Sequence, residues 1–100
     1  MSTTEVLSDR ALDAWLAEGL GTMFGIIPAY SSTGDGMLLV LEAMRERGLM
    51  PTIAGTKGMP WTVAMMGGFA ADGEAESLPR AIADAARNAL LAEHEDAHRG

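Results

Sequence analysis

The chain has no cysteine among its 100 residues, and basic residues are scarce. Without cysteine there is no disulfide framework, no thiolate nucleophile and no sulfur-ligated metal, so the sequence suits a reducing compartment. Seven Lys and Arg stand against fourteen Asp and Glu, which gives a formal net charge of −7. A field of this sign repels phosphate backbones, so we expect no nucleic acid partner.

Long apolar runs are missing as well. A long uncharged stretch that includes residues 20–34 is interrupted by Gly21, Gly25 and Pro28, which argues against a membrane-spanning helix. The first ten residues contain no basic cluster followed by an apolar segment, so they do not resemble a secretory signal. We therefore expect a cytoplasmic protein with no membrane partner.

The composition predicts one domain. Hydrophobic residues make up 48% of the chain, and a chain of this length buries roughly two thirds of the surface that its unfolded form exposes. No repeat, linker or low-complexity tract divides it. We expect a single domain over residues 1–100, with residues 1–7 and 94–100 flexible.

Capping residues and apolar periodicity predict three helices. Ser8 and Ser77 are N-cap candidates for the first and last helix, and residues 31–33 offer several for the second. Gly48 suits the position just after the second helix, where a left-handed backbone is common. The helices are expected at residues 9–18, 34–47 and 78–93.

Three strands are expected between the second and third helices, at residues 49–54, 61–66 and 73–76. Pro51 removes a ladder donor and favours an edge position for the first strand, and Asp72-Gly73 is typical of a turn before the third. Residues 61–66 are apolar on both faces, which favours helices on both faces of the sheet. The predicted fold is therefore α+β: a small antiparallel three-stranded meander sheet flanked by helices in the order α-α-β-β-β-α, an αβα sandwich.

Five short patterns lie between Pro28 and Ala86. They are Pro28-x-Tyr30-Ser31-Ser32-Thr33, Arg45-Glu46-Arg47-Gly48, Trp61-x-Val63, Glu74-Ala75-Glu76 and Pro79-x-Ala81-Ile82-x-x-Ala85-Ala86. Together they resemble the phage αβα sandwich domain, a small family encoded by bacteriophages and prophages, and the similarity covers roughly residues 9–92. Members of that family usually place Asp directly after Ser-Thr, whereas Gly34 intervenes here before Asp35. The resemblance implies an αβα fold and a phage or prophage origin, and it implies no reaction.

Several residues are candidates for holding a small anionic, nucleotide-like ligand. The free amides at the start of the second helix suit an anion, although capping alone also explains that segment. Lys57 lies in Gly55-Thr56-Lys57-Gly58, which fails the phosphate-loop fingerprint and also fits a plain hairpin turn. An aromatic face and an arginine would complete the contacts. The candidate ligand-binding residues are Tyr30, Ser32, Thr33, Gly34, Lys57, Trp61 and Arg80.

Residues suited to catalysis are few. His94 and His98 have helical spacing for a shared metal, but no third ligand is placed beside them apart from their acidic neighbours, and a solvated tail explains them better. No acid has an apolar context that would obviously raise its pKa. We expect no catalytic residue, no metal and no cofactor. A hydrolase that uses carboxylates such as Asp35, or a bound metal, is the enzymatic alternative.

These features predict a non-enzymatic phage or prophage accessory protein that acts by binding in the host cytoplasm. Leu38 and Leu39 fall on the polar side of the second helix, and residues 24–30 are apolar without a clear period. Exposed leucines suggest an interface, although isolated surface leucines are common. We expect a homo-oligomer that captures a small anionic metabolite. The alternative is a structural module or one that binds a host protein.

Overall fold

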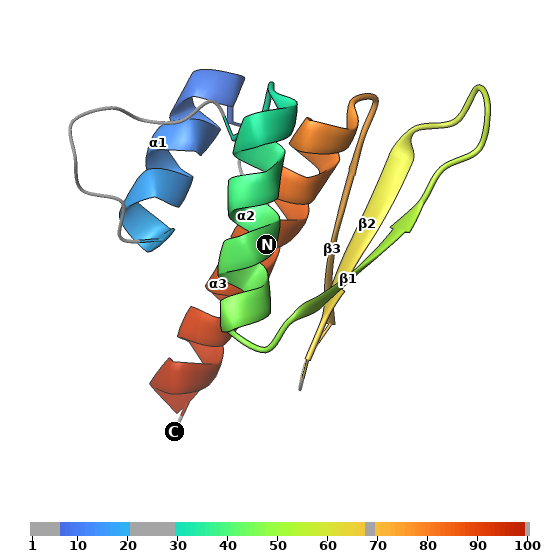
Figure 1. Ribbon diagram of the computed structural model, residues 1–100. Helices are drawn as coiled ribbons and strands as arrows, with labels where there is room; N and C mark the ends of the chain where they lie inside the picture. Colours follow the sequence, from blue (N-terminus) through green and yellow to red (C-terminus); the bar gives the residue numbers. More distant parts are fainter. Residues whose placement is uncertain (1–6, 21–29, 68–69, 100) are drawn as a thin grey trace.

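The computed structural model describes residues 7–20, 30–67 and 70–99. It is a small α+β fold of three helices and one three-stranded antiparallel sheet, which confirms the predicted class and element order (Figure 1). None of the described helices combines the length and apolar character needed to cross a bilayer. The elements are α1 (Asp9–Leu20), α2 (Gly34–Glu46), β1 (Met50–Ala54), β2 (Trp61–Met66), β3 (Ala70–Ala75) and α3 (Leu78–Arg99).

The helices begin where the sequence predicts them. Ser8, Thr33 and Ser77 each accept a hydrogen bond at the side-chain oxygen from the backbone N–H three residues later, over 3.0 to 3.3 Å. A cap of this kind stabilises a helix by about 1 kcal/mol. Gly48 follows the end of α2 with φ of 81°, as expected for a residue in that position.

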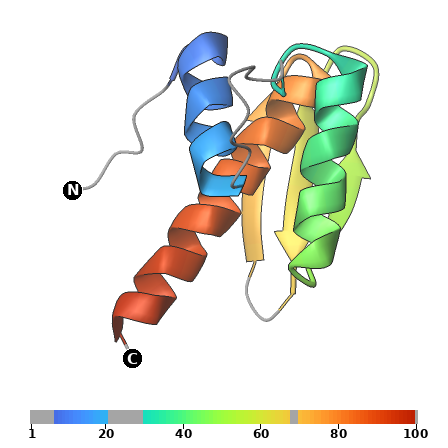
Figure 2. The same ribbon diagram turned by 60° about the vertical axis from the view of Figure 1, so that its left-hand side comes forward.

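All three helices run in the same direction and lie on one face of the sheet (Figures 1 and 2). The strand order is β1-β2-β3, with β1 at the edge beside α2 and β3 beneath α3. On β2, Val63 and Met65 point toward the helices and are fully buried, whereas Thr62 and Met66 on the opposite face are exposed. The structure therefore differs from the expected sandwich in one respect, because the second face of the sheet has no described helix over it.

The prediction that Asp72-Gly73 forms a turn is wrong. Both residues lie inside β3, which begins at Ala70. A Cβ atom at Gly73 would meet the backbone N of Ala85 and would lie 2.6 Å from the carbonyl oxygen of Ala81. Glycine is required here because α3 approaches the strand closely, which is a long-range constraint that the local sequence does not show.

Helix α3 is the centre of the fold. It packs against β2, β3, α1 and α2, and its small side chains permit the close approach. It continues to Arg99, whereas the sequence predicts that the helix ends at residue 93 and that a flexible segment follows. The buried hydrophobic core comprises Leu12, Leu16, Ala17, Tyr30, Val40, Met44, Leu49, Val63, Met65, Ala81, Ile82, Ala83, Ala85, Ala86 and Ala89.

Candidate functional site

Arg80, a predicted ligand contact, donates hydrogen bonds within the protein from all three of its guanidinium nitrogens. Its Nη1 donates to Asp9 Oδ1 at 2.6 Å, its Nε donates to the Asp84 carboxylate at 3.1 Å, and its Nη2 donates to the carbonyl oxygen of Leu7. Partial burial disfavours the charged form, but the hydrogen bonds to Asp9 and Asp84 outweigh it, so the pKa of Arg80 is raised above its ordinary value. The arginine thus ties the start of α1 to the start of α3.

The aromatic ring of Tyr30 is also internal, since only 1% of the residue is exposed. The neighbouring Ser31 donates its backbone N–H to Asp13 Oδ1 at 2.8 Å, and its hydroxyl donates to the carbonyl oxygen of Asp9 at 3.2 Å. Sequence reasoning missed the buried Asp13. Asp13 lies three residues before Leu16, and this spacing places it on the buried face of α1. The same spacing could have identified it from the sequence.

The predicted anion segment at the start of α2 behaves as a helix cap. Thr33 is the N-cap, and its hydroxyl oxygen is occupied by the N–H of Gly36. Ser32 and Gly34 are exposed, and nothing lies within 4 Å of a Cβ built at Gly34. These observations match the capping interpretation of the segment.

Two of the seven predicted residues do share a pocket. Lys57 and Trp61 line a hollow of about 270 Å³ at the β1–β2 hairpin. The indole of Trp61 packs on Gly55, where a Cβ would lie 2.5 Å from the ring, so the aromatic face is held in place. The hairpin pocket is lined by Gly55, Thr56, Lys57, Gly58, Met59 and Trp61.

A larger and more apolar hollow lies between α2 and the edge strand β1. This α2–β1 groove has a volume of about 560 Å³ and was not predicted. Leu38 borders it with 56% of its surface exposed, and Glu42 and Arg45 supply its charges. The residues that line it are Leu38, Leu41, Glu42, Arg45, Gly48, Leu49, Met50 and Pro51.

Leu38 and Leu39 are both exposed, by 56% and 51%, and of the two only Leu38 is among the residues that line the groove. Successive helical residues point about 100° apart, so the two side chains leave α2 in different directions. The remainder of the predicted interface, residues 24–29, lies outside the described residues.

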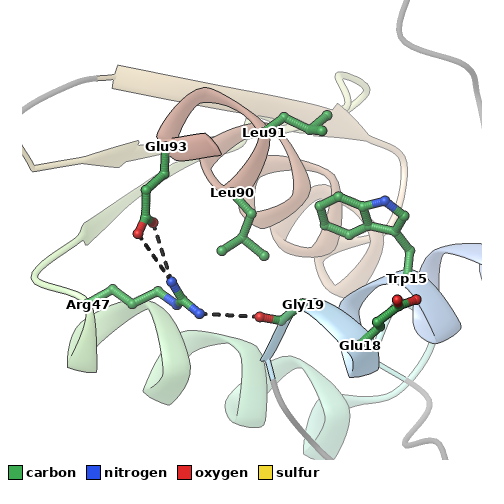
Figure 3. A pocket seen from close by; sticks show the side chains of 7 residues that line it. All are labelled: Trp15, Glu18, Gly19, Arg47, Leu90, Leu91 and Glu93. Atoms are coloured by element: carbon green, nitrogen blue, oxygen red, sulfur yellow. Dashed lines mark hydrogen bonds and ion pairs between the residues drawn. The ribbon is translucent and has the colours of Figure 1, made fainter. Parts of the chain in front are cut away.

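A third hollow, of about 530 Å³, lies between the end of α1 and the middle of α3 (Figure 3). Trp15 and Leu90 form its apolar side. Arg47 reaches across it, donating to the Glu93 carboxylate at 3.4 Å and to the carbonyl oxygen of Gly19 at 3.2 Å (Figure 3). The arginine is therefore used to join helix ends rather than presented to a ligand.

Metal chemistry finds no support in the part of the chain that the structure describes. No group of three acidic or histidine side chains there could hold an ion. His94 and His98 lie in the last turns of α3, and their side chains are outside the described set, so the prediction about them is not tested.

No family model, no curated protein and no solved structure matches this chain. The likeness to the phage αβα sandwich domain therefore stays a prediction. The proposal for function is therefore based on the surface of the protein.

Proposed function

We propose that the protein acts by binding another protein through an apolar surface along β1. The observation that carries this is the distribution of exposed large apolar side chains. Among the described residues, four of the seven lie on α2 at the groove (Leu38), on the helix-facing side of β1 and β2 (Ile53 and Trp61) or on the hairpin between these strands (Met59). We call these four the apolar flank; Met50 pairs with Met66 on the outer face of the sheet and is not part of it.

The chemistry of the apolar flank suits a protein partner. Each apolar side chain left in water forgoes a favourable transfer free energy, so a contiguous cluster favours burial against another surface. Methionine and tryptophan are enriched at protein interfaces because they are adaptable or offer large contact areas. The chain as a whole has a net charge of −7, whereas the groove and hairpin pocket together hold one acid, Glu42, and two bases, Arg45 and Lys57. A partner therefore need not be basic.

Binding also fits better than catalysis. A reaction would need a nucleophile or an acid–base pair aimed into a hollow. The α2–β1 groove has one carboxylate, Glu42, and the hairpin pocket has none. Asp35, the carboxylate of the hydrolase alternative, is exposed in the first turn of α2. A host protein as target, and a phage or prophage origin, are proposed from the family resemblance.

Site-specific photocrosslinking in cells that produce the protein tests this proposal. A photoreactive residue at Met59, which is exposed on the hairpin, should form a discrete product with one partner, and the same residue at the exposed Asp35 should not. Ile53→Lys should abolish the product, whereas Thr52→Lys, on the opposite face of β1, should retain it. Equal products from both positions, or none at Met59, would refute the proposal.

A small anionic ligand is the second candidate, and the shared pocket of Lys57 and Trp61 favours it. The indole face would stack on a base, and the ammonium would pair with phosphate. The chain has two tryptophans, so Trp15→Phe leaves Trp61 as the only one to report a nucleotide titration. Saturable quenching that Lys57→Met weakens would support this site, and a flat titration would remove it.

A further inference from the structure

We propose that the α2–β1 groove is occupied by a second copy of this chain. Two copies would pair across a two-fold axis, with their α2 helices antiparallel and Leu38 of each copy in the groove of the other. This inference rests on the proposed binding function and names the occupant of one part of the apolar flank. The hairpin residues Met59 and Trp61 are left for a different partner.

The charges of the groove are complementary to themselves. Glu42 and Arg45 lie three residues apart on α2, and neither forms an ion pair with another described residue. Three residues span about 4.5 Å along a helix, which long side chains bridge. In an antiparallel pair, Glu42 of one copy therefore meets Arg45 of the other, and the two-fold axis repeats the contact. The dimer would therefore contain two equivalent ion pairs, each between Glu42 of one copy and Arg45 of the other.

The other surfaces suit self-association less well. Two chains of charge −7 repel each other, so the electrostatic repulsion between copies is smallest where the local charge is balanced. On the outer face of the sheet, Asp72 and Glu74 are exposed on β3 and would face like charges. At the hollow beside Trp15, the cation Arg47 is already bound to Glu93. The groove contains one acid and one base, and neither is paired with a residue in the described part of the chain.

The edge strand favours helix contact over an extended sheet. Pro51 in β1 has no N–H to donate to a strand of another chain. Proline on an edge strand is a common means of preventing sheet-to-sheet pairing. The α2 helices and the apolar wall of the groove are therefore the elements that meet.

Sedimentation equilibrium of the full chain tests the inference with a matched pair of variants. Wild type should behave as a monomer–dimer system, and Leu38→Glu should raise the dissociation constant by more than about 100-fold, because it places a charge in the apolar contact twice per dimer. Leu39→Glu makes the same change on the same helix at similar exposure, outside the groove, and should leave the dimer intact. Circular dichroism establishes that both variants fold.

Charge reversal identifies the orientation. The dimer should dissociate in the Glu42→Arg variant and in the Arg45→Glu variant, because each substitution turns both ion pairs into pairs of like charge. An equimolar mixture of the two variants should recover a heterodimer, because each Arg then faces a Glu. A monomeric wild type, dissociation by Leu39→Glu as readily as by Leu38→Glu, or a mixture that stays monomeric would overturn the inference. None of these outcomes changes the crosslink expected at Met59. The crosslinking experiment therefore tests the proposed function independently of the dimer.

Discussion

Replacing Gly73 by alanine perturbs the contact on which the packing of α3 depends. The added Cβ would lie 2.6 Å from the carbonyl oxygen of Ala81, whereas ordinary contacts of this kind begin near 3.4 Å. The helix must therefore move about 0.8 Å from β3, or the strand must bend. Backbone atoms of Ala81 and Ala85 make the contact, so no side chain can rotate away to relieve it.

The expected cost follows from two opposing effects. Overpacking a core contact typically costs about 1 to 3 kcal/mol, and losing the glycine returns about 0.4 to 1 kcal/mol by restricting the unfolded chain. We therefore expect Gly73→Ala to lower the free energy of unfolding by about 1.3 kcal/mol. For a domain of this size that corresponds to a fall in the melting temperature of about 5 to 10 °C.

Urea denaturation followed by circular dichroism measures this change, and two other glycines provide controls. Gly34→Ala adds a Cβ with no neighbour within 4 Å at the start of α2, so stability should stay equal or rise by up to about 1 kcal/mol. Gly48→Ala also meets no atom but forces φ of 81° on alanine, and should cost about 1 kcal/mol. A Gly73→Ala protein within about 0.5 kcal/mol of wild type would refute the close-approach argument.

Three side-chain contacts make further predictions for the same urea assay. Arg80→Ala should lower the free energy of unfolding by about 2 kcal/mol, since it removes hydrogen bonds to two carboxylates and a carbonyl. An unchanged urea midpoint would show that these hydrogen bonds do not stabilise the packing of α1 on α3. Asp13→Ala should cost about 1 to 3 kcal/mol because the buried N–H of Ser31 loses its acceptor, and a smaller loss would mean that water replaces it. Arg47→Ala should change stability by less than about 1 kcal/mol, as its pair with Glu93 is solvent-exposed, and a larger loss would contradict that assignment.

Features set by neighbouring residues could be predicted from the sequence. The N-caps Ser8 and Ser77 act within three residues of their own position, and Gly48 acts on its own φ. The short apolar run at residues 61–66 likewise identified β2, although it did not distinguish the buried face from the exposed one. Such signals fixed the element order because they are local in the chain.

Contacts between distant residues were not predictable. The turn interpretation of Asp72-Gly73 failed because α3, not the dipeptide, determines the conformation of Gly73. Arg80 resembled an available cation, but Asp9, 71 residues away, occupies it. Of the candidate site, only Lys57 and Trp61 were both predicted and brought together, because the hairpin that joins them is itself local.

Methionine oxidation by peroxide inside cells that produce the protein, compared with the purified chain, tests the binding surface most directly. Met59 on the hairpin and Met66 on the outer sheet face are 68% and 52% exposed, whereas Met65 is fully buried and serves as an unreactive reference. Burial of the apolar flank by a partner predicts that Met59 is protected in cells relative to Met66. The same ratio of Met59 to Met66 oxidation in cells and in purified protein would contradict it.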